Sequence, residues 1–304
     1  MIPESYTDLG FTRYRGLLSI ASDNGENFGR QLGAMFNKKV FLLDSGSSAL
    51  CLASQIVSLN RSTAKYVGCA AYTCPSVPKS IEQAGLLPFF IDTKSGDWRF
   101  SLDWRKAAAD KLDGTVGAIV SNHLFGDIRE QKARSDEVLE IADVSQCFPT
   151  PRIARIIQQS DMAVLSFGAG KPLPLMGGGA LLVDFNLKLP TDITVAPTLT
   201  LNGFPTLALY PFLLRPRVWR YLRRMLQSGE ITEKPVSRAK VGVLSRSRSV
   251  VGGMVLPELV AQDIQHQQFF EQLHELFANS GFSTPYESAA DHSGVRIGLV
   301  AESE

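Results

Sequence analysis

The sequence predicts an α/β protein built around one mostly parallel sheet of seven strands. From residue 39 to 185, short apolar runs alternate with segments of helical periodicity, which is the pattern of consecutive βαβ units. The predicted strands are 39–43, 66–72, 87–92, 116–122, 137–143, 162–167 and 178–185. Near residue 186 this alternation gives way to a proline-punctuated stretch. We therefore expect a large three-layer α/β/α domain over residues 1–190 and a smaller C-terminal α/β domain over residues 191–304.

Four segments have helical patterns. The first follows strand 39–43, with Ser48 as its candidate N-cap and with apolar residues at helical spacing, namely Leu50, Ala53, Ile56 and Val57. The others are the alanine-containing run 101–112, the basic and aromatic run 215–226, and the run 261–277. The last is amphipathic, and its expected apolar side consists of Ile264, Phe269, Leu273 and Phe277.

The run 215–226 has two interpretations. Its arginines, interleaved with Trp219 and Tyr221, could lie on a membrane surface or bind a nucleotide diphosphate. A helix that packs its apolar face on the large domain, with its arginines in solvent, is the simpler reading and the favoured one.

Composition excludes several classes of protein. The 31 basic and 30 acidic residues leave a formal net charge of +1, so no broad electrostatic attraction to nucleic acid or to an anionic membrane is expected. The four cysteines form no CxxC pair and no cluster with metal-ligand spacing, which favours a reducing cytoplasm. The start of the chain lacks the apolar core of a secretory signal, and no window offers about 18 uninterrupted apolar residues, so neither secretion nor a membrane span is expected.

Small polar residues follow the first predicted strand, at the end where open α/β sheets bind ligands. The turn reads Asp44, Ser45, Gly46, Ser47 and Ser48, and a helix follows it. Backbone N–H groups and hydroxyls at the positive end of a helix dipole suit a phosphate group. An ordinary capped turn uses the same residue types, so this motif does not decide the matter alone.

Two further strand ends carry charged residues. Asp143 ends strand 137–143, where a carboxylate can keep a pyridine nitrogen protonated, although aspartate is also frequent in turns. Lys171 follows a loop of small residues after strand 162–167, which would let its amine reach into a cleft and act as a nucleophile. Taken alone, it is more simply read as a surface lysine.

Taken in order, these motifs resemble those of the DegT/DnrJ/EryC1/StrS family of sugar aminotransferases, which belong to the fold-type I pyridoxal phosphate enzymes. The similar stretches lie within about residues 30–185 and read LLDSGSSALCLASQ, YTCPSVPKSIEQAGLLPFFID, AIVSNHLFGDIRE, IADVSQCF and SFGAGKPLPLMGGGALLVDF. The resemblance implies an aspartate-aminotransferase-like fold, pyridoxal 5'-phosphate as cofactor, and a homodimer.

The resemblance also implies roles for the matching residues. Lys171 would hold the cofactor as a Schiff base and carry the proton during amino transfer. Asp143 would pair with the pyridine nitrogen, and Gln146 would lie against the O3 side of the ring. The phosphate would be bound by Gly46, Ser47, Ser48 and Ser166. His123 falls in a strand-end motif, where a packing or hydrogen-bonding role is at least as well supported as a catalytic one.

The sequence departs from the family pattern at three places. Where an aromatic residue usually stacks on the cofactor ring, the aligned residue is Cys74, and Tyr72 lies two positions away as the alternative. The glycine motif, residues 176–179, reads Met-Gly-Gly-Gly and lacks the usual acidic residue. Members of the family usually continue further, so part of the C-terminal wall of the substrate pocket is expected to be reduced.

We therefore expect a pyridoxal phosphate-dependent aminotransferase that moves an amino group from an amino acid donor to a keto sugar, expected to be nucleotide-linked, in polysaccharide or glycan biosynthesis. The alternative is a cofactor-binding but inactive homologue that serves as a regulatory or assembly partner. A dehydratase is less expected, because that subgroup carries histidine in place of the lysine. A nicotinamide cofactor fits poorly, because the glycines at 177–179 precede a strand and do not open a helix.

Overall fold

The structure is a computed structural model of the 304-residue chain. It describes residues 25–93, 96–100, 104, 105, 108, 112–129, 131, 137–191, 241–278, 282, 283, 286, 288–294, 296, 300 and 301. The helix expected over 215–226 lies outside the described residues, as does most of the one expected over 101–112.

All seven predicted strands are present in one sheet. They are β1 (Lys39–Leu43), β2 (Ala64–Ala70), β3 (Leu87–Ile91), β4 (Thr115–Asn122), β5 (Leu139–Asp143), β6 (Met162–Ser166) and β7 (Gly179–Val183), in the spatial order β1-β7-β6-β5-β4-β2-β3. The pairs among β2 to β6 are parallel, and β7 is antiparallel to both β1 and β6. The carboxyl ends of β2, β4, β5 and β6 therefore lie along the same edge of the sheet.

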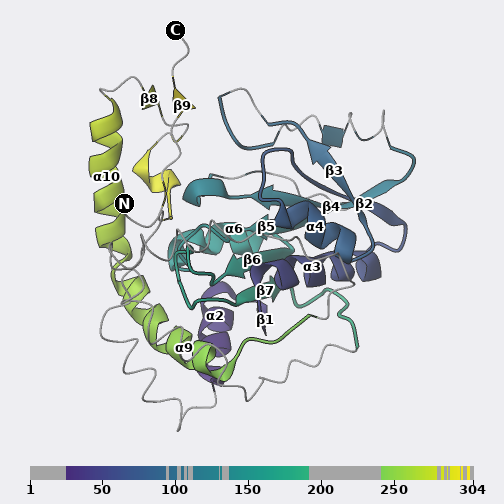
Figure 1. The fold of residues 1–304 in the computed structure, drawn as a ribbon, viewed down its shortest axis with the longest axis horizontal. Helices are drawn as coiled ribbons and strands as arrows, with labels where there is room; N and C mark the ends of the chain where they lie inside the picture. Colours follow the sequence, from purple (N-terminus) through teal and green to yellow (C-terminus); the bar gives the residue numbers. More distant parts are fainter. Residues whose placement is uncertain are drawn as a thin grey trace, which may run out of the picture.

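Helices cover both faces of this sheet (Figure 1). One face packs on α3 (Gly46–Asn60) and α4 (Ser76–Gln83), and the other on α2 (Glu26–Phe36), α6 (Ala154–Gln159) and α9 (Arg246–Ala261). The side chains of β6 show why: Met162 and Val164 join the first cluster, whereas Ala163 and Leu165 join the second. This alternation with period two, apolar on both faces, produces the predicted three-layer α/β/α arrangement.

The helix after β1 begins earlier than predicted. Ser45, not Ser48, is its N-cap: the Ser45 side chain accepts a hydrogen bond from the Ser48 backbone N–H at 3.1 Å. Ser48 lies in the first turn and is buried. Ser45, Ser47 and Ser48 are all possible N-caps by residue type. Ser45 is the N-cap because its hydroxyl reaches the backbone amide three residues later.

The described C-terminal part contains α9, α10 (Asp263–Ala278) and the antiparallel pair β8 (Phe282–Ser283) and β9 (Val300–Ala301). Helix α9 shares a core cluster with α2, and Figure 1 shows the two helices side by side. The short helices are η1 (Leu124–Gly126), η2 (Pro151–Ile153) and η3 (Ala289–Asp291). No helix in the described ranges has the length and apolar character needed to cross a membrane. The domain boundary near residue 190 stays a prediction.

Helix α10 confirms the prediction for 261–277, but its buried side differs from the expected one. Ile264 and Phe269 are 69% and 55% exposed, whereas Phe270 is buried. The ring centroid of Phe270 lies 3.8 Å from that of His292, and His266, one turn earlier, stacks on Phe148 at 4.4 Å. Contacts with these aromatic rings, which come from distant parts of the chain, therefore select the packed side of α10.

Candidate active site

The segments that carry the predicted site residues follow β1, β2, β5 and β6. Register in the sheet pairs Asp143 with Asn122 on β4, and Ser166 with Gly179 on β7. Tyr72 and Cys74 follow β2, and Lys171 follows β6. Parallel strands thus bring most of the predicted residues to one edge, where α/β proteins bind their ligands.

Three backbone segments meet at the head of α3 without room for side chains. A Cβ atom on Gly46 would lie 2.9 Å from the Cβ of Ser166 and 3.1 Å from its Oγ. A Cβ on Gly179 would lie 2.6 Å from the backbone nitrogen of Gly46. The preceding Gly178 has φ +104° and bridges to Ser45, so the glycine motif packs directly against the turn. Gly46, Ser166 and the glycine motif therefore form one close-packed junction at the head of α3, which we call the cradle.

The hydroxyl groups at the cradle are partly engaged by an acidic residue. Asp44 accepts hydrogen bonds from the hydroxyls of Ser45, at 3.3 Å, and of Ser48. Ser48 is thereby turned toward Asp44 and away from solvent. The N-terminal amides of α3 lie at the positive end of its dipole, and the Asp44 carboxylate lies close to that same end.

Lys171 is carried by a loop that is anchored at both ends. Its backbone N–H donates to Gly168 O at 3.1 Å, and Leu175 and Gly177 both donate to Phe167 O. From α9, Arg248 donates through Nε to Leu175 O and through Nη2 to Met176 O, each at 3.1 Å. The loop is therefore stabilised by the carbonyl at the end of β6 and by an arginine from beyond the proline-rich stretch.

The Lys171 side chain lines a cavity of about 140 Å³. The other described residues of its wall are Gln146, Gly170, Pro172 and Arg296. Beside it, burial and the charges of Asp127 and Asp143 raise the pKa of the Cys147 thiol well above its usual value. The positive charge of Lys171 opposes that rise in pKa, which means that the lysine amine is close enough to the Cys147 thiol to affect it electrostatically.

Asp143 is the last residue of β5 and Gln146 lies in the turn that follows, and the two make different contacts. Asp143 Oδ1 accepts a hydrogen bond from the Ser145 backbone N–H at 3.1 Å, and its side chain is half-buried. Gln146 Oε1 accepts from the Phe125 backbone N–H at 2.9 Å. Gln146 thus joins the turn after β5 to the loop after β4, and it also faces the cavity that Lys171 lines.

His123 is a buried, neutral residue at the end of β4. Burial lowers its pKa, against the opposing effects of its hydrogen bond to Asp127 and of the charges of Asp127 and Asp143. Its Nδ1 lies 2.7 Å from Asp127 O, and because a carbonyl can only accept, Nδ1 carries the proton. Nε2 is then an acceptor, and it has no hydrogen-bond partner among the described residues.

Neither predicted stacking residue is enclosed. Tyr72 is 56% exposed, and its ring centroid lies 6.5 Å from that of Phe125. Cys74 is exposed and accepts a hydrogen bond from the Ser76 hydroxyl at 3.1 Å. Which of Tyr72 and Cys74 stacks on the cofactor ring stays a prediction.

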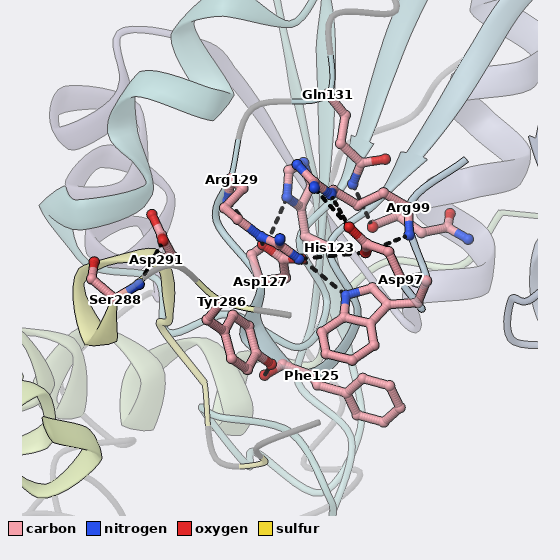
Figure 2. A network of polar contacts seen from close by, with 12 residues as sticks. Asp97, Arg99, His123, Phe125, Asp127, Arg129, Gln131, Tyr286, Ser288 and Asp291 are labelled. Atoms are coloured by element: carbon pink, nitrogen blue, oxygen red, sulfur yellow. Dashed lines mark hydrogen bonds and ion pairs between the residues drawn. The ribbon is translucent and has the colours of Figure 1, made fainter. Parts of the chain in front are cut away.

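A buried ion pair supports the loop after β4, as Figure 2 shows. Asp127 is fully buried and accepts from Arg129 Nη2 at 2.6 Å, from Arg129 Nε at 3.0 Å and from Trp98 Nε1 at 2.9 Å. The Trp98 ring in turn packs edge-on against Phe125, with centroids 5.0 Å apart. Because a buried carboxylate needs several donors, this set of contacts determines where the loop lies.

The sequence analysis missed two residues, Phe125 and Arg296. Phe125 has φ +56°, a left-handed conformation that is rare for a bulky residue and is often found at functional sites. Arg296 reaches the Lys171 cavity from the end of the chain. The LFG sequence after β4 is a weak signal for the conformation of Phe125. Nothing in the tail VRIGLV indicates that Arg296 lies beside Lys171. In the described part of the chain, no cluster of histidine, cysteine or acidic residues could hold a metal ion.

Comparisons with solved structures show the same fold in sugar-modifying enzymes. A candidate sugar aminotransferase from Streptococcus pneumoniae, in its PMP form, has a TM-score of 0.64 and 16% identity, covering 96% of this chain and 77% of that one. The GDP-4-keto-6-deoxy-D-mannose-3-dehydratase of E. coli, with bound hydrated PLP, has a TM-score of 0.67 and 14% identity, with coverages of 100% and 79%. Sugar aminotransferase CalS13 from Micromonospora echinospora has a TM-score of 0.62 and 16% identity, with coverages of 99% and 81%. Identities this low establish the fold and not the substrate.

No curated protein matches the sequence. A family model does match it: the DegT/DnrJ/EryC1/StrS aminotransferase family, over residues 18–191. This range is more than half of the chain and contains the cradle, Asp143, Gln146 and Lys171. The chain therefore belongs to the DegT/DnrJ/EryC1/StrS aminotransferase family.

Proposed function

We propose that this protein is a pyridoxal phosphate-dependent aminotransferase that acts on a keto sugar, nucleotide-linked, in polysaccharide or glycan biosynthesis. The observation that carries the proposal is the arrangement of Lys171, Asp143 and the cradle along one sheet edge. We further propose that it works in the cytoplasm as a homodimer, with glutamate or another amino acid as donor.

The residues present fit the cofactor. The cradle brings Ser166 beside the head of α3, and a phosphate group suits the N-terminal amides of α3 and the Ser47 and Ser166 hydroxyls. Asp143 offers a carboxylate for a protonated ring nitrogen, and Lys171 offers an amine for the aldehyde carbon. When bound, pyridoxal phosphate supplies an electron sink that lets an amino group move from donor to ketone.

The chain's own residues then have separate tasks. The amides of Gly46 and Ser47, at the positive end of α3, bind the phosphate group and orient the cofactor. The Asp143 carboxylate holds the proton on the ring nitrogen. The Lys171 Nζ atom would be the base that takes and returns the proton at the substrate carbon. Gln146, whose Oε1 is engaged by Phe125, keeps its amide group toward the cavity.

The presence of lysine supports amino transfer over dehydration, even though one structural neighbour is a dehydratase. Position 171 has the amine that a transaminase needs, whereas the resemblance implies histidine there in the dehydratase subgroup.

The test is the absorbance spectrum of the purified protein with pyridoxal phosphate, before and after L-glutamate. We expect a visible band that is lost on adding the amino acid and returns with an oxo acid. Lys171→Ala should lack the band, and the exposed Lys188→Ala, a matched control, should keep it. A protein that never takes up the cofactor would refute the proposal. A stable band that no amino acid changes would support the inactive-homologue alternative.

A further inference from the structure

A second cavity lies at the opposite end of the sheet from Lys171 and Asp143. Its volume of about 570 Å³ is within the roughly 300–1,000 Å³ of small-molecule sites. Its wall is formed by the residues that begin β2 and β4, by those that precede β5, and by the stretch between β3 and β4. Because β4 runs from Thr115 to Asn122, which pairs with Asp143, roughly 20 Å of strand separates the cavity from the candidate active site. The two are therefore distinct sites.

Trp104 contributes a buried hydrogen-bond donor to this wall. The residue is 3% exposed, and its ring packs in one cluster with Phe100, Ile119 and Val138. Its Nε1 has no hydrogen-bond partner among the described residues. An indole nitrogen can only donate, and leaving such a donor buried and unpaired costs stability. An acceptor oxygen of a ligand in the cavity would offset that cost.

Two arginines of the wall are held in place by contacts with the protein. Arg61, at the C-terminal end of α3, donates through Nε to Glu137 O at 2.9 Å and through Nη1 to Asn60 O at 3.1 Å. The guanidinium carbon of Arg105 lies over the Trp104 ring, 4.8 Å from the ring centroid. Glu137 is the only acidic residue among the described members of the wall. Positive charge therefore predominates, and it lies beside the unpaired indole donor.

The rest of the wall includes an apolar surface. Ala108, Leu112, Val116 and Val138 line the cavity together with the Trp104 ring. Leu112 and Val116 also pack against the cluster that contains Trp104, so this surface is continuous with the core on that side of the sheet. A bare inorganic anion would leave these side chains without a contact. The lining therefore suits a molecule that has both an anionic group and an apolar body.

We propose that this cavity binds a planar organic anion, a small apolar molecule with one carboxylate or similar oxyanion. The anionic group binds to Arg61 and Arg105, whose planar guanidinium groups match a carboxylate, and one of its oxygens accepts from Trp104 Nε1. The apolar body packs on Leu112 and Val116. This site is independent of the proposed function, because none of these residues touches the cavity that Lys171 lines.

The first test is calorimetry with 1-naphthoate, an aromatic carboxylate, and the full chain carrying pyridoxal phosphate. We expect binding, and we expect Arg105→Gln to weaken it about fivefold or more, because a charged partner of the carboxylate is lost. The uncharged 1-naphthamide, which has the same shape, should bind more weakly than 1-naphthoate by a similar factor. Arg30→Gln is the matched control, because it removes an exposed arginine from α2, outside this wall. A wild type that does not bind 1-naphthoate, or one that binds it no better than Arg105→Gln, would overturn the proposal.

The second test follows the indole donor by NMR of protein with isotope-labelled tryptophan. The Trp104 Nε1–H signal is identified as the one missing from Trp104→Phe, and 1-naphthoate should shift it. Trp104→Phe keeps an aromatic ring but has no donor, so it should weaken binding about two- to tenfold, with circular dichroism confirming that it is folded. A Trp104 signal that 1-naphthoate leaves in place would refute the proposed contact.

The third test separates this cavity from the candidate active site. Without added cofactor, Lys171→Ala should bind 1-naphthoate as tightly as the wild type does. If Lys171→Ala weakens the binding and Arg105→Gln does not, the anion occupies the active site and the proposal fails. That result would leave the proposed aminotransferase function standing.

Discussion

Gly46 and Gly179 show at the level of single residues why the cradle needs glycine. A Cβ on Gly46 would lie 2.9 Å from the Ser166 Cβ, and a Cβ on Gly179 would lie 2.6 Å from the Gly46 backbone nitrogen. Neither atom can move without shifting β6, β7 or the head of α3. The requirement therefore comes from the meeting of three segments, and it would hold even if the cradle bound no ligand.

Substituting Gly179 by alanine should consequently damage both stability and cofactor binding. We expect the free energy of unfolding to fall by about 1–3 kcal/mol, which is typical of overpacking in a close-packed interior. Pyridoxal phosphate should also bind more weakly, because the Gly46 amide is displaced. Gly29→Ala is the control: its Cβ would meet Leu42 Cδ1 at an ordinary 3.5 Å, so neither quantity should fall. Denaturant unfolding and a cofactor titration measure the two effects, and an unchanged Gly179→Ala would contradict this account of the cradle.

Asp44 suggests a second prediction at this scale. Its carboxylate lies at the head of α3, where it engages the Ser45 and Ser48 hydroxyls. A phosphate group bound at the same helix end would be repelled by it. Asp44→Asn should therefore tighten binding of pyridoxal phosphate about two- to fivefold, the scale of a screened surface charge interaction below about 1 kcal/mol. Binding of pyridoxal, which has no phosphate, should not change, and equal effects on both compounds would show that Asp44 acts through the fold.

At the scale of elements, the strands were predictable and the loops were not. Each strand is an apolar run bounded by polar or small residues, so its position is a local property of the sequence. The N-cap of α3 was misassigned among Ser45, Ser47 and Ser48, because local pattern does not say which hydroxyl reaches an amide. The packed side of α10 depends on ring contacts with Phe148 and His292, which lie outside the helix, and Phe125 is held by Gln146 and Tyr286 from other segments. Such contacts leave no periodic signal.

The same reasoning explains what was found of the site. Asp143 and Ser166 end strands and Lys171 follows one, so the sheet itself brings them to one edge. Arg296 reaches that edge because the chain before it packs closely at Gly294 against Gly126. No sequence pattern indicates this contact. The sequence therefore indicated the residues at the strand ends better than the residue that comes from the C-terminal part of the chain.

Helix α10 and the segment around His292 should loosen in acid. Burial lowers the pKa of His292 below its ordinary value of 6.5, and the charge of Arg152 lowers this pKa further. Hydrogen bonds to the Arg296 and Phe125 backbones and the charge of Asp127 raise the pKa of His292 and so oppose the effect of burial. A lowered pKa in the folded state means that the unfolded chain binds more protons, so stability falls as pH drops below about 6.5. We expect His292→Gln to flatten the dependence of the unfolding free energy on pH between about 6.5 and 5. Phe270→Leu, which disturbs the same ring contact without removing a titratable group, should lower stability but keep the slope. An unchanged slope in His292→Gln would refute this.

At the scale of the whole molecule, α9 belongs to the core of the sheet although the chain reaches it only after the proline-rich stretch. Val251 and Leu256 are buried in one cluster with Phe28 of α2, and Arg248 holds the Lys171 loop. The residues that complete the fold of residues 25–191 therefore come partly from beyond residue 241.

Removing one of these core side chains should destabilise the sheet and α9 together. Leu256→Ala should lower the free energy of unfolding by about 2–5 kcal/mol, because Leu256 is 1% exposed. Leu276→Ala on α10, where the leucine is 67% exposed, is the matched control and should change it by less than about 0.5 kcal/mol. Circular dichroism and the fluorescence of the tryptophans should report the same midpoint. Separate midpoints would show that α9 unfolds independently of the sheet.

The central claim is that Lys171 binds pyridoxal phosphate covalently, and peptide mass spectrometry after borohydride reduction tests it most directly. Reduction makes the bond between cofactor and lysine permanent, so the modified peptide identifies the residue. We expect the added mass on the peptide that contains Lys171, and no modified peptide from Lys171→Ala. A cofactor attached to another lysine, or no attached cofactor after reconstitution, would contradict the account.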